Sequence, residues 1–455
     1  MQLKKDLFKV FNSNGINLLV GIITGFLVPA FLSLDDYAAL RTFTLYLSYV
    51  GILHFGFVDG VYIKYGGKYE EDLNPGKLKG EHRFLLLFQF LITALAIIVG
   101  IILDDIIFIA FAIAILPMNM QSLFSFLYQA LGRFNIYSQI IVLTPTLLLL
   151  FNLLLIFVLK ISNFWPFIIV NILTYYIVFL VLEIYFFNKY KGVKAIIDFK
   201  DIWSNFKVGT FILIGNLSTI LFYAMDRWFV KLFLTTKDFA FYSFAVSMMG
   251  IFNTLISAVT LTFYPYLARG QDEENLKLLK KYLLIIGVFA SGGYFVFDII
   301  VNLFLEKYVL SLDIIMILFA GFPATIILNA IYINLYKANK QERKYAFTVF
   351  IMCCVSIIFS VIALLIHKST LAIALSTTLA FYFWYFYCIK DFKALKPDIK
   401  ELGFLTVFVM AYASSHILFN GIVYFVMITL ATYLFYKKEL LLIVRKKGLK
   451  KEKSK

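Results

Sequence analysis

Residues 208–234 read VGTFILIGNLSTILFYAMDRWFVKLFL, a continuous apolar run that is long enough to cross a bilayer as one helix. The run nevertheless contains Asp226, Arg227 and Lys231. A charge at membrane depth costs about 2.5–3.5 kcal/mol on insertion scales, so it usually faces a bundle interior or a water-filled cavity. Arg227 and Lys231 are four residues apart and share one helical face, which indicates a site for an anion. The alternative is that both side chains snorkel to the lipid headgroups.

The composition of the whole chain agrees with that run. Of the 455 residues, 62% are hydrophobic and only 15% are charged, whereas a soluble domain has about 45–50% apolar and 25% charged residues. The chain is therefore predicted to be an all-α polytopic membrane protein. The three cysteines, Cys353, Cys354 and Cys388, lie in apolar spans without the spacing of a metal site or a disulfide framework. We expect them to be packing residues, and we expect no cofactor.

Hydropathy predicts about fourteen transmembrane helices. The basic N-terminal segment leads into an apolar run without a small-residue cleavage site, so we interpret it as a first helix rather than a signal peptide. The expected helices span residues 15–34, 37–58, 84–103, 106–127, 138–159, 166–187, 208–234, 240–264, 282–302, 313–335, 345–366, 369–389, 402–418 and 421–436.

The distribution of Lys and Arg predicts the orientation. With these helices, 35 of the 42 Lys and Arg residues fall on the side of the N-terminus. Cytoplasmic loops are enriched in Lys and Arg, so both termini are expected in the cytoplasm. The net charge of +15 is then mainly a topology signal that also suits an anionic inner leaflet. No nucleic-acid partner is needed.

Short repeated patterns indicate an internal duplication. Asp36-Tyr37-Ala38 and Asp238-Phe239-Ala240 are 202 residues apart, and Leu127-Tyr128-Gln129-Ala130 and Leu335-Tyr336-Lys337-Ala338 are 208 apart. Six helices followed by six more in the same orientation form a parallel repeat, which in transporters places the substrate in a central cavity between two rocking lobes. The expected domains are an N-lobe over 1–200, a C-lobe over 201–395, an extra helix pair over 396–436 and a basic cytoplasmic tail over 437–455.

The sequence resembles the polysaccharide flippases of the multidrug/oligosaccharidyl-lipid/polysaccharide (MOP) exporter superfamily, the Wzx-type translocases of O-antigen and capsule units. The resemblance covers the first twelve helices and depends on the order of short motifs. They are Asp36-Tyr37-Ala38, Phe55-Gly56-Phe57-Val58-Asp59-Gly60, Gln129-Ala130-Leu131-Gly132-Arg133, Met225-Asp226-Arg227 and Tyr264-Pro265-Tyr266-Leu267. One departure is Ala38, where relatives often have Gly.

The resemblance implies transport of an undecaprenyl-diphosphate-linked oligosaccharide across the bacterial plasma membrane for polysaccharide biosynthesis. Arginine suits a diphosphate because its planar guanidinium makes bidentate bonds to phosphate oxygens. We therefore expect Arg41, Arg227 and Lys231 to bind the diphosphate, with snorkelling or pairing to nearby acids as the alternative for Arg41. Asp226 is expected to orient Arg41 or Arg227, or to act as a proton-coupling acid. A proton or sodium gradient and other polysaccharide-assembly proteins are compatible with this function.

Four further residues are expected at the cytoplasmic mouth, namely His54, Asp59, Lys64 and Arg133. A lone His within a span is more often packed than functional, and Lys64 and Arg133 also fit the positive-inside rule. Asp59-Gly60 is expected to break the second helix and cap the loop that follows.

Two other functions remain open. A multidrug antiporter of the same superfamily would rely on intramembrane acids, whereas the charges here are mainly basic. A membrane glycan polymerase or glycosyltransferase would need a large outer loop or an acidic metal-binding domain. We expect a transporter and not an enzyme.

Overall fold

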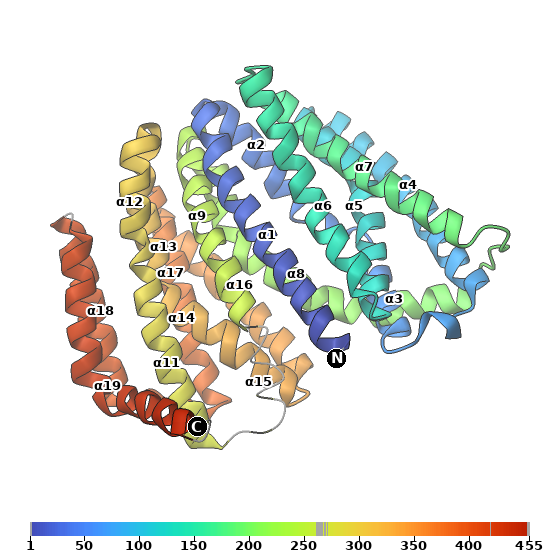
Figure 1. Cartoon of the computed structure of the whole chain (residues 1–455). Coiled ribbons are helices and arrows are strands. Elements are labelled where there is room, and N and C mark those ends of the chain that lie inside the picture. Colours follow the sequence, from blue (N-terminus) through green and yellow to red (C-terminus); the bar gives the residue numbers. More distant parts are fainter. Residues whose placement is uncertain (1, 261–266, 268–269, 271, 419, 453–455) are drawn as a thin grey trace. The chain divides into compact units, whose positions relative to one another are not determined.

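The computed structural model of the chain describes residues 2–260, 267, 270, 272–418 and 420–452. These residues form helices joined by short connections, and none of them lies in a β-strand (Figure 1). The chain divides into two compact units. Unit 1 comprises Met1–Lys231 and Thr235–Ser243, and unit 2 comprises Leu232–Leu234 and Phe244–Lys455.

Unit 1 holds the first seven α-helices and α8 as far as Lys231. They are α1 (Gln2–Phe31), α2 (Leu34–Leu47), α3 (Phe57–Tyr65), α4 (Pro75–Ile102), α5 (Ile106–Ala130), α6 (Phe134–Leu153), α7 (Phe164–Lys189) and α8 (Phe199–Phe233).

Unit 2 holds most of α9 and the helices that follow it. They are α9 (Thr236–Thr260), α11 (Glu273–Ser291), α12 (Gly293–Phe304), α13 (Leu312–Phe319), α14 (Phe322–Ile327), α15 (Ile333–Ala338), α16 (Glu342–Ile366), α17 (Thr370–Tyr387), α18 (Ile399–Ile417) and α19 (Gly421–Glu452).

The prediction of an all-α polytopic membrane protein is confirmed. Among the described residues, 10 helices are long and apolar enough to span a membrane, or up to 12 if each of two bent pairs counts as one span. The predicted thirteenth and fourteenth spans are α18 and α19, which fall outside that number. α19 also continues past the predicted span to Glu452, after a kink at Tyr436.

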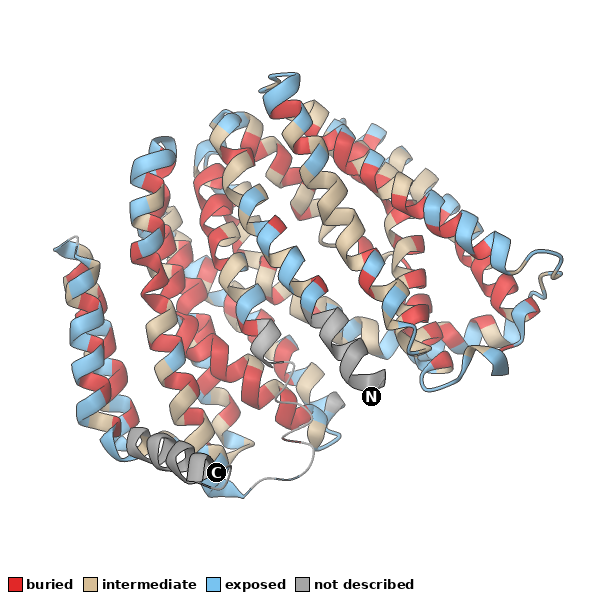
Figure 2. Ribbon diagram, in the orientation of Figure 1, coloured by how far each residue is buried: buried red, intermediate tan, exposed pale blue. Residues whose placement is uncertain are grey.

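Exposed residues occur along the helices (Figure 2), and many of them are large and apolar. On α4, Leu87, Phe90, Leu91 and Leu95 are at least half exposed. A contiguous apolar surface of this kind marks contact with a partner or with lipid. The length and hydropathy of α4 identify the contact as lipid.

The second predicted span is not one helix. α2 ends at Leu47, and α3 begins at Phe57 after a bend of 52°. Phe55 and Gly56 adopt the left-handed conformation, with φ values of 51° and 84°. Asp59 and Gly60 therefore lie in the first turn of α3, so the prediction that they break the helix was wrong. The break comes before them, at a position that requires positive φ and so favours glycine.

Close approach of α3 and α8 explains why two glycines face each other. A Cβ atom added to Gly60 would lie 2.0 Å from the carbonyl oxygen of Asn205. One added to Gly209 would lie 1.7 Å from the carbonyl oxygen of Gly56. The two backbones are in direct contact, so any side chain at these positions would push α3 away from α8.

The starts of α2 and α9 have the same cap. The Oγ atom of Ser33 accepts the N–H of Asp36 at 3.1 Å, and Oγ1 of Thr235 accepts the N–H of Asp238 at 3.2 Å. In both cases the hydroxyl also donates to the aspartate carboxylate. The repeated Asp-aromatic-Ala pattern is therefore a helix-start signal at both places.

The ends of α5 and α15 share the same turn. The N–H of Arg133 donates to the carbonyl of Tyr128, and the N–H of Gln341 donates to that of Tyr336, both at 2.8 Å. The left-handed residue of each turn is Gly132 or Lys340, with φ values of 67° and 53°. This six-to-one hydrogen bond closes the end of a helix, and the two copies are 208 residues apart.

A buried lysine has the same role in each unit. Nζ of Lys79 on α4 donates to the carbonyls of Tyr190 and Val193 at 3.2 and 3.0 Å, just after α7. Nζ of Lys280 on α11 donates to the carbonyl of Leu395 at 2.7 Å, after α17. Each lysine thus satisfies backbone carbonyls where the chain leaves a helix.

Candidate functional site

Arg41 lies two turns into α2, where the Ser33 cap starts the helix. Its Nε donates to the hydroxyl of Tyr37 at 2.7 Å, and its guanidinium carbon lies 4.9 Å from the centre of that ring. Arg41 is half-buried. Tyr37 and Arg41 are four residues apart, so they lie on the same face of α2. Their contact therefore holds the guanidinium against this helix and leaves its other N–H groups available for an anion.

Asp226 and Arg227 lie in the last third of α8. One carboxylate oxygen of Asp226 accepts the N–H of Arg227 at 2.7 Å, and the other accepts the hydroxyl of Tyr242 at 2.8 Å. Asp226 is buried, with 6% of its surface exposed. Nε of Arg227 is buried and has no hydrogen-bond partner among the described residues. A buried guanidinium N–H without an acceptor is costly, so a ligand that accepts from it would be bound favourably.

Lys231 connects α8 to α2. Its Nζ donates to Oγ1 of Thr42, the residue next to Arg41, at 3.1 Å. The same atom lies 5.7 Å from the ring centres of Tyr46 and Phe239. These contacts place the ammonium group in an aromatic surround, where a cation is attracted to ring faces.

Aromatic side chains hold α8 against the C-terminal end of α2, next to Lys231. Nε1 of Trp228 donates to the hydroxyl of Tyr49 at 2.7 Å, and its ring stacks on Tyr46 at 5.9 Å. The hydroxyl of Tyr46 in turn donates to Asp105 at 2.8 Å. α2 and α8 as far as Lys231 belong to unit 1.

The three cations share one property. Among the described residues, none of Arg41, Arg227 and Lys231 forms an ion pair. The nearby acids Asp105 and Asp226 accept hydrogen bonds from tyrosines. Arg41 and Lys231 are thus held by the neutral side chains of Tyr37 and Thr42, an arrangement that an anionic ligand would complete.

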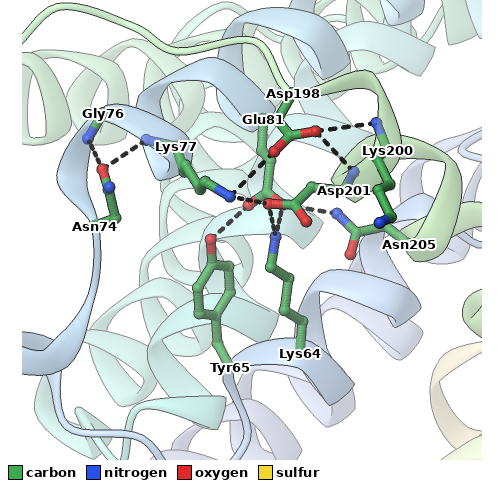
Figure 3. A network of polar contacts seen from close by, with 10 residues as sticks. All are labelled: Lys64, Tyr65, Asn74, Gly76, Lys77, Glu81, Asp198, Lys200, Asp201 and Asn205. Atoms are coloured by element: carbon green, nitrogen blue, oxygen red, sulfur yellow. Dashed lines mark hydrogen bonds and ion pairs between the residues drawn. The ribbon is translucent and has the colours of Figure 1, made fainter.

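Of the four residues predicted at the cytoplasmic mouth, Lys64 is part of a charged network (Figure 3). Its Nζ lies 2.7 Å from Oε1 of Glu81 and 3.1 Å from Oδ2 of Asp201. Glu81 also accepts the hydroxyl of Tyr65 at 2.7 Å and the side-chain amide of Asn205 at 2.8 Å. The network joins α3, α4 and α8 where Gly60 lets the backbones touch, so Lys64 holds helices together.

His54 and Asp59 are both buried at the break between α2 and α3, with 4% of each exposed. Nδ1 of His54 accepts the N–H of Gly56 at 3.1 Å and lies 3.8 Å from Oδ2 of Asp59. Asp59 also sits in the first turn of α3, where the helix dipole favours a negative charge. These contacts stabilise the bend, and both side chains are buried, while Oδ2 of Asp59 has no hydrogen-bond partner among the described residues.

Arg133 binds Glu70 in the loop before α4, and Lys189 at the end of α7 binds the same carboxylate. Burial would raise the pKa of Glu70, but these two cations outweigh it and hold that pKa below the usual 4.5. The side chain of Arg133 is still 55% exposed. Arg133 therefore anchors a loop at this end of the unit.

Sequence reasoning did not identify Thr42, Tyr46 or Tyr242 as part of the site. These residues are ordinary in membrane helices, and their roles depend on which helix packs beside them. Among the described residues there is also no group of three or more His, Cys, Asp or Glu side chains able to hold a metal ion. The motif Tyr264-Pro265-Tyr266 lies outside the described residues.

Comparison with solved structures identifies the fold. No protein-family model matches the sequence, and no curated protein matches it significantly. The structure does match the lipid II flippase MurJ in an inward closed conformation, with a TM-score of 0.69 and 14% identity over 96% of this chain and 98% of that one. It also matches an inward-facing multidrug resistance MATE transporter of the MOP superfamily, with a TM-score of 0.63 and 12% identity over 83% and 95%. The chain therefore shares the fold of these two proteins.

A third match is a MATE protein in complex with MaD3S, with a TM-score of 0.53 and 13% identity over 86% of this chain and 97% of that one. The first two of these matched structures are a flippase and a transporter.

Proposed function

We propose that this protein is a flippase that moves undecaprenyl-diphosphate-linked oligosaccharides from the inner to the outer leaflet by alternating access, for surface polysaccharide synthesis. The observation that carries the proposal is the set of half-buried cations at one end of unit 1 that have no ion-pair partner among the described residues, Arg41, Arg227 and Lys231. The fold supports it, since one of the matched solved structures is a lipid II flippase.

The proposal follows from the chemistry of the cargo. A lipid-linked sugar has an apolar tail that can stay in the bilayer, and a diphosphate and glycan that need a polar passage. Cations at membrane depth are costly unless something compensates them. A diphosphate does so through charge-assisted hydrogen bonds, which are stronger than neutral ones. Asp226 then acts as a positioning residue, because it holds the backbone of Arg227 and the hydroxyl of Tyr242.

Orientation, membrane and energy source are also part of the proposal. The charge bias of the sequence supports a bacterial plasma membrane protein with both termini in the cytoplasm. A proton or sodium gradient would drive transport, and other polysaccharide-assembly proteins would deliver and use the cargo.

A multidrug antiporter is the second candidate, because a MATE transporter has the same fold. Such a protein would bind cationic drugs, and the acids near the site would be its ligands. Asp226 accepts a hydrogen bond from Tyr242, and Asp105 accepts one from Tyr46. Each aspartate could bind a cationic drug only after that hydrogen bond is broken. A glycan polymerase or glycosyltransferase would require an extramembrane catalytic domain, and the connections between the described helices are too short for one.

The test is transport by Arg227→Ala, Lys231→Ala and Arg41→Ala in proteoliposomes that contain a fluorescent undecaprenyl-diphosphate-linked sugar. Loss of a charge-assisted hydrogen bond costs about 1.5–3 kcal/mol, so each variant should transport about 10- to 150-fold more slowly at limiting substrate. Lys368→Ala removes an exposed lysine in unit 2 and is the matched control. Normal transport by all three variants would refute the proposal, and drug efflux in its place would favour the antiporter.

A further inference from the structure

A polar groove lies between α1 and α6 in unit 1, two helices that run side by side (Figure 1). Its volume is about 650 Å³, within the range of about 300–1,000 Å³ that small-molecule sites occupy. Its lining contains three amides and three hydroxyls, from Asn12, Asn135, Gln139, Ser13, Ser138 and Thr146.

Two hydroxyls in the polar groove lack partners. Ser138 is buried, with 7% of its surface exposed, and its Oγ has no hydrogen-bond partner among the described residues. The same is true of Oγ1 of Thr146, two turns further along α6. A buried polar group without a partner costs about 1–3 kcal/mol. Two such groups on one wall of a groove indicate that a polar ligand completes them.

The spacing along α6 makes this wall continuous. Residues 135, 138, 139, 142 and 146 follow the three- and four-residue steps of one helical face. Val142 and Leu143 supply an apolar strip beside the amides and hydroxyls. Side-chain amides and hydroxyls both donate and accept, as sugar hydroxyls do, and an apolar strip suits the C–H face of a sugar ring.

The charge of the groove narrows the ligand class. The side chains that line it are all uncharged, so the groove offers neither a cation for a phosphate or uronate nor an anion for an ammonium group. Its lining on α6 runs from Asn135 to Thr146 and includes none of the three cations Arg41, Arg227 and Lys231. The groove and the three cations are thus built for different chemistry.

We propose that the groove between α1 and α6 binds an uncharged sugar of the cargo and contributes to selection of the glycan. This inference rests on the proposed function. Ser138, Gln139 and Thr146 provide the hydrogen bonds that distinguish a sugar-bearing carrier from a bare one. The diphosphate is bound by the three cations in both cases.

The experiment measures binding to the full chain in nanodiscs. The probes are undecaprenyl diphosphate, the same lipid carrying one N-acetylglucosamine, and the same lipid carrying one glucuronic acid. We expect the N-acetylglucosamine probe to bind about tenfold more tightly than the other two. The combined variant Ser138→Ala, Gln139→Leu, Thr146→Val should remove that difference and leave binding of bare undecaprenyl diphosphate unchanged.

Misfolding is separable from loss of binding, because the variant removes unpaired buried hydroxyls and should be at least as stable as the wild type. Thr406→Ala, which removes an exposed hydroxyl from α18, is the matched control. Equal binding of the three probes by the wild type, or a difference that persists in the variant, would overturn the sugar site alone. Failure of all three probes to bind the wild type would instead overturn the proposed function.

Discussion

Replacing Gly60 by alanine tests the contact between α3 and α8. The new Cβ atom would lie 2.0 Å from the carbonyl oxygen of Asn205, whereas an ordinary van der Waals contact begins at 3.4 Å. The two backbones would have to separate locally by about 1.4 Å, the difference between those values. That movement would stretch the 2.8 Å hydrogen bond from Asn205 to Glu81.

The expected loss combines two effects. Overpacking of a close contact costs about 1–3 kcal/mol, and loss of a hydrogen bond costs about 1 kcal/mol. We therefore expect Gly60→Ala to lower the free energy of unfolding by about 2–4 kcal/mol. Titration of the purified protein in mixed micelles with sodium dodecyl sulfate, followed by tryptophan fluorescence, measures this quantity.

Gly21→Ala is the control, since a Cβ atom on Gly21 in α1 would meet nothing within 4 Å. There alanine should raise stability by up to about 1 kcal/mol through its better helix propensity. The two glycine substitutions thus have opposite expected signs. A Gly60→Ala protein as stable as the wild type would refute the view that direct backbone contact holds these helices.

Two further predictions concern polar contacts within unit 1. Burial would raise the pKa of Glu70, but its two cationic partners, Arg133 and Lys189, hold that pKa below 4.5. The ion pairs therefore stabilise the folded protein at neutral pH. This stabilisation is lost as the pH falls below 4.5 and through the pKa of Glu70 in the folded protein. Glu70→Gln should flatten the pH dependence of the unfolding midpoint in this range, and an unchanged profile would contradict the assignment. His82→Leu removes a 2.7 Å contact to buried Glu183 and should cost about 1–3 kcal/mol. The double variant His82→Leu, Glu183→Leu should recover part of that loss in the same titration, and a double variant less stable than the single one would argue against the pairing.

Hydropathy predicted most helices of this fold because their apolar runs are long and are separated by short polar segments. It did not predict the bend within the second span, which depends on the left-handed conformation of Phe55 and Gly56. The sequence contains Gly56 and Gly60, but it does not show which residues of α8 they contact. Close contact between residues 60 and 205 is a property of tertiary packing.

The candidate site was predictable only in part. The cations Arg41, Arg227 and Lys231 are conspicuous in apolar runs, and the structure places Lys231 beside α2. The partners of Lys64 and Arg133 were not predictable, because Glu81, Asp201 and Glu70 lie on other elements. The sequence could therefore identify unusual charges but not which of them are neutralised by the fold.

The buried lysines Lys79 and Lys280 affect how the orientation of this protein can be studied. Both belong to the set of cations that predicts cytoplasmic loops, yet each is bound to backbone carbonyls, with 7% and 2% of its surface exposed. Experiments that invert a membrane protein by removing positive charges would have to retain these two. Otherwise a failure to fold would be mistaken for a change of topology.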